Sequence, residues 1–245
     1  MTIAPEIEIR RAEERLVTST YWLQGRHCFS FGNMYDPSNT HHGLLLVSND
    51  DIIQPRTGFD THPHRDMEIV TWVLEGELEH KDTLGNVDII HPGLAQRMSA
   101  GRGIWHSEKN PSRDKAVRLV QMWVLPDTES IDPGYEQLDI GSELDKGGLI
   151  PIASGRDHHA AITIRQSGAV LWVARLSPGE SVKVPDARYA HIFVARGSAS
   201  LQGAGDLGEG DSARLTAGGT PLLSAGPNGA EVLIWDLEDI SQGSW

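Results

Sequence analysis

The sequence predicts an all-β protein that contains two β-rich domains in tandem. Short runs in which apolar and polar residues alternate recur along the chain, as expected for strands with one buried face. The 26 glycines and 13 prolines are spread over the whole length, which is typical of many strands joined by turns. A length of 245 residues suffices for one large or two modest domains of this class.

In the first half, residues 1–20 are polar and are compatible with short strands or with one helical turn. The aromatic residues of segment 22–35 are interpreted mainly as core. Strands or strand-like segments are then expected at residues 43–48, 67–75, 87–90 and 117–125, with a turn-rich segment at 98–104.

Residues 126–150 are rich in Asp, Glu, Gly and Pro and show little periodicity, so the domain boundary is placed there. The second half repeats the β-rich pattern, with strands expected at 169–176, 190–195, 198–201 and 232–237. We therefore expect an N-terminal domain over residues 1–130, an interdomain segment over 131–150 and a C-terminal domain over 151–245.

Charge and cysteine content limit the classes of function. The chain has 34 acidic and 21 basic residues, a net charge of −13, which argues against direct binding to nucleic acid or to anionic membranes but not against a protein partner. No apolar run approaches the roughly 18 residues of a membrane span. The single cysteine, Cys28, is expected to be packed, and without a signal-peptide pattern we expect a cytoplasmic protein.

Two pairs of metal-ligand residue types stand at a spacing of two. His62 and His64 form one pair, and His106 and Glu108 form the other. Because side chains at i and i+2 lie on the same face of a strand, each pair would point in one direction. If the two strands face each other across a barrel, three imidazoles and one carboxylate converge on one point, a set that suits Fe, Ni, Cu, Mn or Zn. The alternative for the first pair is two surface or hydrogen-bonded histidines.

The chain resembles the pirin family of the cupin superfamily, with the closest similarity between Trp22 and Trp123. The motifs that carry the resemblance are His62-Pro63-His64-Arg65, Glu68-Ile69-Val70-Thr71, Leu74-Glu75-Gly76 and Gly101-Arg102-Gly103-Ile104-Trp105-His106-Ser107-Glu108. Two further segments, Cys28-Phe29-Ser30-Phe31 and Tyr35-Asp36-Pro37, are similar to the bacterial, quercetinase-like branch.

This resemblance implies two cupin-type jelly-roll β-barrels in tandem, of which the N-terminal one binds metal and the C-terminal one does not. It implies one divalent ion per chain, with Fe(II) as the preferred ion and His62, His64, His106 and Glu108 as its ligands. The implied activity is that of a quercetin 2,3-dioxygenase, in which dioxygen opens a flavonol ring and Glu108 accepts the flavonol proton. The alternatives are a metal-dependent regulator that acts through a protein partner and a structural zinc protein. Because the two barrels can cover each other's faces, the sequence is compatible with a monomer.

Further residues are expected around the metal. Glu68 has the parity of His64 and is a candidate for orienting a ligand histidine, although a buried ion pair with an arginine would explain it equally well. Pocket candidates are Phe31, Met34, Gln121 and Trp123. His80 and His91 lack a partner at i+2 that would complete a site, so both are interpreted as polar residues of the rim.

Overall fold

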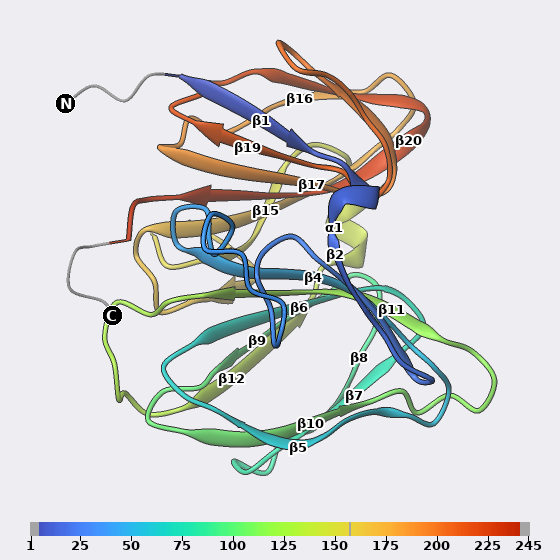
Figure 1. The fold of residues 1–245 in the computed structure, drawn as a ribbon, viewed down its shortest axis with the longest axis vertical. Helices are drawn as coiled ribbons and strands as arrows, with labels where there is room; N and C mark the ends of the chain where they lie inside the picture. Colours follow the sequence, from blue (N-terminus) through green and yellow to red (C-terminus); the bar gives the residue numbers. More distant parts are fainter. Residues whose placement is uncertain (1–4, 157, 241–245) are drawn as a thin grey trace.

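The structure is a computed structural model that describes residues 5–156 and 158–240. Its regular structure is almost entirely β-strand, arranged as two stacked barrels, with the N-terminal one at the bottom in Figure 1. The predicted all-β class is therefore confirmed. Within the described ranges, no helix is both long enough and apolar enough to cross a membrane.

The N-terminal barrel consists of two sheets that face each other. The larger sheet has, in spatial order, β12 (Gly134–Asp139), β9 (Leu94–Ser99), β6 (Glu68–Glu75), β11 (Val117–Val124), β4 (Leu45–Ile53), β3 (Leu23–His27) and β2 (Leu16–Ser19). The smaller sheet has β5 (Gly58–His64), β10 (Ile104–Lys109), β7 (Leu78–Asp82) and β8 (Val87–Ile90).

The C-terminal barrel is one continuous hydrogen-bonded sheet. Its main path runs through β1 (Glu6–Arg10), β19 (Ser212–Thr216), β17 (Tyr189–Leu201), β20 (Leu222–Leu237), β15 (Ala169–Leu176), β13 (Ile150–Ser154) and β14 (Ile162–Thr163). Two short strands join this path, β16 (Ser181–Lys183) on β20 and β18 (Gly205–Leu207) on β17. The helical segments are short: η1 (Ala12–Glu14) and α1 (Gly141–Leu144).

Two edge strands lie differently from the domain division expected from sequence. Strand β1 belongs to the segment assigned to the N-terminal domain, but it pairs with β19 in the C-terminal sheet. Strand β12 belongs to the expected interdomain segment, but it pairs with β9 in the N-terminal sheet. Edge strands are held by partners far away in sequence, so local composition carries no record of which sheet they join. The boundaries at residues 130 and 150 stay a prediction.

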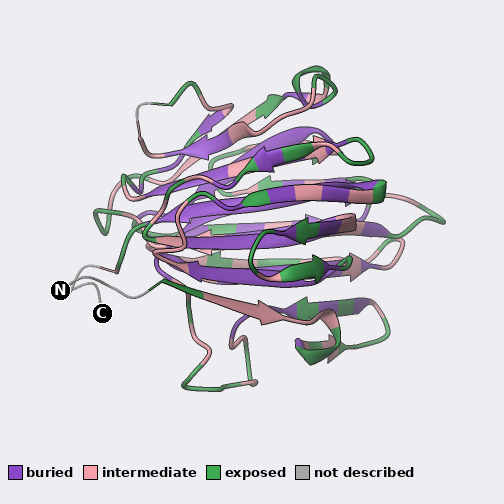
Figure 2. Cartoon of the chain, turned by 90° about the horizontal axis from the view of Figure 1, so that it is seen from above, coloured by how far each residue is buried: buried purple, intermediate pink, exposed green. Residues whose placement is uncertain are grey.

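The largest apolar cluster fills the seam where the two barrels meet. Strand β6 directs Val70, Trp72 and Leu74 into this seam, where they belong to the same buried cluster as Phe193 and Trp235 of the C-terminal barrel. The alternate residues of β6 point into the N-terminal barrel, which explains why the strand reads as a nearly continuous apolar run. Figure 2 shows the resulting band of buried residues along the central strands. Burial of each such large side chain contributes about 1.5–3 kcal/mol.

Candidate metal centre

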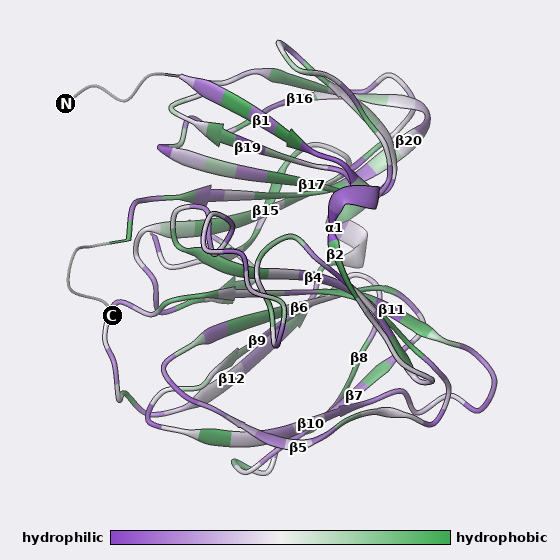
Figure 3. Ribbon diagram, in the orientation of Figure 1, coloured by the Kyte–Doolittle hydropathy of each residue, from purple (hydrophilic) through white to green (hydrophobic). Residues whose placement is uncertain are grey.

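The β5–β10 pair carries both predicted ligand pairs, and its register brings them together. His62 lies directly opposite His106, and His64 lies opposite Ile104 on the same pair of strands. Strands β5 and β10 are mainly hydrophilic, in contrast to the strands at the seam (Figure 3). The strands approach closely at Gly58, where an added Cβ would lie 2.2 Å from the backbone oxygen of Glu108. Glycine is therefore required for this pairing.

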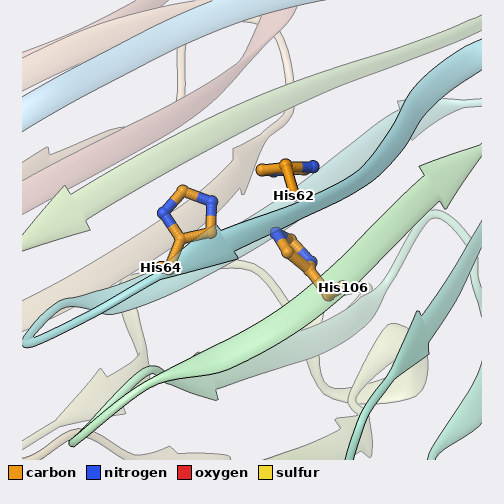
Figure 4. A group of neighbouring side chains, drawn as sticks. All are labelled: His62, His64 and His106. Atoms are coloured by element: carbon orange, nitrogen blue, oxygen red, sulfur yellow. The ribbon is translucent and has the colours of Figure 1, made fainter.

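The three histidine side chains converge on one point. One ring nitrogen of each of His62, His64 and His106 lies within 4.8 Å of the others, and Figure 4 shows the rings turned toward one another from β5 and β10. The ring centroids are 4.4 Å apart for His62 and His106 and 5.0 Å apart for His64 and His106. The turn before β10 depends on Gly101, which has φ +48° and where an added Cβ would lie 2.3 Å from the oxygen of Ile131.

The protonation states of these imidazoles suit metal binding. Burial, followed by the neighbouring histidines, lowers the pKa of His64 to about 4 and the pKa of His106 to about 3. Both rings are therefore neutral at pH 7 and keep a free lone pair for a cation. The Nδ1 of His62 lies 2.7 Å from the backbone oxygen of Asp60, so Nδ1–H is the donor and Nε2 is left free.

His106 is the least satisfied polar side chain at this point. It is 2% exposed, and neither of its ring nitrogens has a hydrogen-bond partner within residues 5–156 and 158–240. A buried polar group without a partner costs about 1–3 kcal/mol. A divalent cation shared with His62 and His64 would satisfy one of these nitrogens, so the residues fit a metal ion.

Glu108, the predicted fourth ligand, faces the barrel interior beside the three histidines but is not part of their group. Its two carboxylate oxygens each lie 2.9 Å from the amide nitrogen of Gln121, which donates to them. The amide oxygen of Gln121 accepts a hydrogen bond of 3.1 Å from the indole nitrogen of Trp123. The structure thus brings together Glu108, Gln121 and Trp123 in one hydrogen-bonded chain. The ring centroid of Trp123 lies 4.9 Å from that of His64, in a T-shaped contact.

Glu68 does not point toward the histidines, in contrast to the expectation from parity. Its carboxylate accepts hydrogen bonds from the hydroxyl of Ser99, at 2.8 Å, and from the backbone nitrogen of Arg165, at 3.0 Å. It lies on the seam face of β6, and burial raises its pKa. The alternation breaks at the turn between β5 and β6, where Asp66 has φ +48°, so parity counted from His64 does not carry across.

His80 is not a rim residue as expected; it is buried, and its ring lies 5.3 Å from that of His106. Its Nε2 lies 3.1 Å from a carboxylate oxygen of Asp82, which fixes its orientation. His91 is partly exposed, with Nε2 3.8 Å from Asp139. His80 and Asp82 stand at a spacing of two on β7. This spacing was the sequence pattern from which a buried His–Asp pair could have been predicted.

Asp51 is a second buried carboxyl in the barrel that the sequence did not indicate. Strand β4 was expected to end near residue 48 but continues to Ile53, which places Asp51 inside. Burial, followed by the charges of Asp50 and Glu108, raises the pKa of Asp51 to about 8. The side chain therefore holds a proton at neutral pH close to Glu108.

A pocket of about 530 Å³ opens beside Trp123, whose ring centroid lies 4.9 Å from that of His64. The three histidines are not among its lining residues. It includes three of the predicted pocket residues, Phe31, Met34 and Trp123, and the rings of Phe31 and Trp123 are 5.8 Å apart. Its volume is in the range of small-molecule sites, and its lining is mostly apolar. A separate cleft of about 490 Å³ reaches His62 from the side of Trp22 and Phe59.

Comparison with known proteins agrees with this geometry. The family model described as Pirin matches residues 9–124, and the model described as Quercetinase C-terminal cupin domain matches residues 151–237. The chain is a member of the pirin family. The predicted family and the predicted pair of tandem cupin-type barrels are thereby confirmed.

Individual relatives match over four fifths or more of the chain. A Mycobacterium tuberculosis protein named "Putative quercetin 2,3-dioxygenase Rv0181c" is 55% identical over 94% of this chain and 95% of its own length. The Quercetin 2,3-dioxygenase of Escherichia coli K12 is 39% identical over 80% of this chain and 84% of its own length.

The crystal structure of YhhW from Escherichia coli superposes with a TM-score of 0.88 at 34% identity, and the match covers 96% of this chain and 99% of YhhW. A second YhhW structure, which is described as a bacterial pirin in complex with nickel(II), superposes with the same TM-score.

Proposed function

We propose that this protein is a metal-dependent dioxygenase that opens the ring of flavonols such as quercetin. The observation that carries the proposal is the buried His106, which faces His62 and His64 and whose two ring nitrogens have no hydrogen-bond partner in the described part of the chain. The quercetin 2,3-dioxygenase names of the relatives and the nickel(II) complex of YhhW support it.

His62, His64 and His106 would hold one divalent ion per chain, with Glu108 as a fourth ligand. We place Fe(II) first, and Ni, Cu, Mn or Zn would fit the same donor set. Such an ion, when bound, supplies the Lewis acidity that makes the enol hydroxyl of a flavonol acidic and its ring rich in electrons. Dioxygen then contributes both of its oxygen atoms to the opened ring, and one ring carbon leaves as carbon monoxide.

The residues around the histidines supply binding, orientation and proton transfer. Phe31, Met34 and Trp123 give the pocket an apolar, partly aromatic lining that suits a flat ring system. Glu108 is the acceptor for the hydroxyl proton, because it is a buried carboxylate that faces the same interior as the histidines. Gln121 holds this carboxylate in place through its amide group, and Trp123 fixes the orientation of that amide.

Oxygen uptake and carbon monoxide release with quercetin test the proposal directly. The metal-free protein would be loaded separately with Fe(II), Ni(II), Cu(II), Mn(II) and Zn(II), and His62→Ala would be compared with His91→Ala, a partly exposed histidine outside the cluster. We expect turnover with at least one redox-active ion, lost in His62→Ala and kept in His91→Ala. Stoichiometric metal binding without turnover for any flavonol would refute the activity and favour a regulator that acts through a protein partner.

A further inference from the structure

The seam between the barrels has a polar end, and it lies where β1, β19 and β17 run side by side. Residues that lie opposite one another on these three strands form rows across the sheet. Two rows have their side chains on the face that packs against the N-terminal barrel: Arg10–Ser212–Phe193 and Glu8–Arg214–His191. The row between them, which contains Ala213 and Ile192, points into the C-terminal barrel instead. Neighbouring strands are about 4.8 Å apart, so these rows form one small patch.

Arg15 covers this patch from the opposite side. Its guanidinium carbon lies 5.3 Å from the centre of the Phe193 ring, and an added Cβ on Gly210 would lie 2.7 Å from one of its nitrogens. Arg15 lies between η1 and β2, so it approaches from the part of the chain that enters the N-terminal barrel. The guanidinium carbon of Arg214 lies 4.4 Å from the centre of the Phe29 ring, which also belongs to that barrel.

Buried polar atoms without partners gather in this patch. Arg15 and Arg214 are 7% and 6% exposed, and Ser212 and His191 are 0% and 1% exposed. Six atoms of the patch have no hydrogen-bond partner among the described residues: Nε of Arg10, Nε and Nη1 of Arg15, Nε2 of His191, Oγ of Ser212 and Nε of Arg214. The arginine nitrogens can only donate, so the missing partner must be an acceptor.

The charges at the patch leave a surplus of positive charge. Arg10 and Arg214 share the carboxylate of Glu8, at 2.7 and 3.8 Å. Arg15 and Arg118 share that of Asp50, at 3.3 and 3.0 Å, and Arg118 also pairs with Glu209. Four arginines therefore meet three carboxylates.

One further acidic group nearby is the Cys28 thiol, which does not offset this surplus. Burial raises its pKa, so the thiol is neutral at pH 7.

We propose that a small inorganic anion of the chloride type binds at this polar end of the seam, held by Arg10, Arg15, Ser212 and Arg214. An anion accepts hydrogen bonds from several donors at once and offsets the surplus charge. A water molecule matches the patch less well, because its own two hydrogens need acceptors and the patch consists mainly of donors. The anion connects the sheet that contains β1 and β19 to Arg15, and thus joins the two barrels.

The first test measures melting temperature against chloride concentration, with sodium gluconate keeping the ionic strength constant. Gluconate is much larger than chloride, so only chloride is expected to raise the melting temperature in a saturable way. At a hundredfold excess over the dissociation constant, the rise for a chain of this size is about 5 to 10 °C. Bromide is expected to act as chloride does.

The variant Ser212→Ala removes one donor while it leaves every hydrogen bond within the protein intact, so the fold is kept. We expect a weaker chloride response than in the wild type and, in gluconate alone, a melting temperature at least as high. The exposed Ser200, on the same strand as His191, gives the matched control Ser200→Ala, which should keep the full response.

Crystals soaked in bromide locate the ion through its anomalous scattering. The proposal expects a bromine peak within hydrogen-bonding distance of the side chains of Ser212 and Arg214. A water molecule at this position without anomalous signal would overturn the proposal, and so would equal melting temperatures in chloride and gluconate.

Discussion

Replacement of Gln121 by leucine is expected to weaken metal binding without removing any of the three histidines. The amide nitrogen of Gln121 lies 2.9 Å from both oxygens of Glu108, and the two side chains are buried. One nitrogen serves both oxygens, so we count a single charge-assisted interaction of about 1.5–3 kcal/mol. Loss of a group that orients a metal ligand typically lowers affinity 10- to 100-fold. We therefore expect the dissociation constant for Ni(II) to rise by roughly this factor, equivalent to about 1.4–2.7 kcal/mol.

The assay is a competition titration of Ni(II) between the metal-free protein and a chelator, together with urea unfolding of the metal-free protein. Gln137→Leu is the matched control, because the Gln137 amide donates to Asp88 at 3.1 Å and has no hydrogen bond to Glu108. We expect this control to lose some stability and to keep its nickel affinity. An unchanged nickel affinity in Gln121→Leu would refute the idea that Gln121 positions Glu108 for the metal.

Three further predictions follow from buried groups and from the pocket. The pKa of Asp51 is raised to about 8, so ionisation in the unfolded state lowers stability as pH rises from about 4 to 8; Asp51→Asn should remove this decline and add about 4 kcal/mol at pH 7, measured by urea unfolding. Burial lowers the pKa of His191 far below 6.5, so this residue contributes to a fall in stability as pH drops below about 6.5, and His191→Gln should make that slope less steep in the same assay; an unchanged slope would contradict this account. Met34→Ala should raise the KM for quercetin about tenfold through lost apolar contact, with metal content and kcat unchanged in steady-state assays; a fall in kcat alone would speak against a binding role.

The strands and the shared face of each ligand pair could be predicted from the sequence, because both depend on local spacing. A period of two predicted that His62 and His64 share a face, whereas their convergence with His106 follows from the pairing of β5 with β10, which only the fold and the family resemblance supply. The prediction that Glu68 faces the same interior as His64 is wrong, because a turn with positive φ at Asp66 interrupts that period.

Asp51 and His80 were missed for a different reason. Each is polar yet lies inside the barrel, and polar residues within a strand resemble the end of that strand or an exposed rim. The pairing of β1 with β19 could not be predicted from the sequence either. It joins residues that are about 200 positions apart in the chain, and only the closed fold brings them together.

The measurement that tests the central claim most directly is the metal content of the purified protein after saturation with Ni(II) or Fe(II) and removal of free ions, determined by elemental analysis. We predict one ion per chain in the wild type and in His91→Ala, and almost none in His106→Ala, with circular dichroism showing that all three proteins are folded. A folded His106→Ala protein that still retains one tightly bound ion per chain would contradict the account.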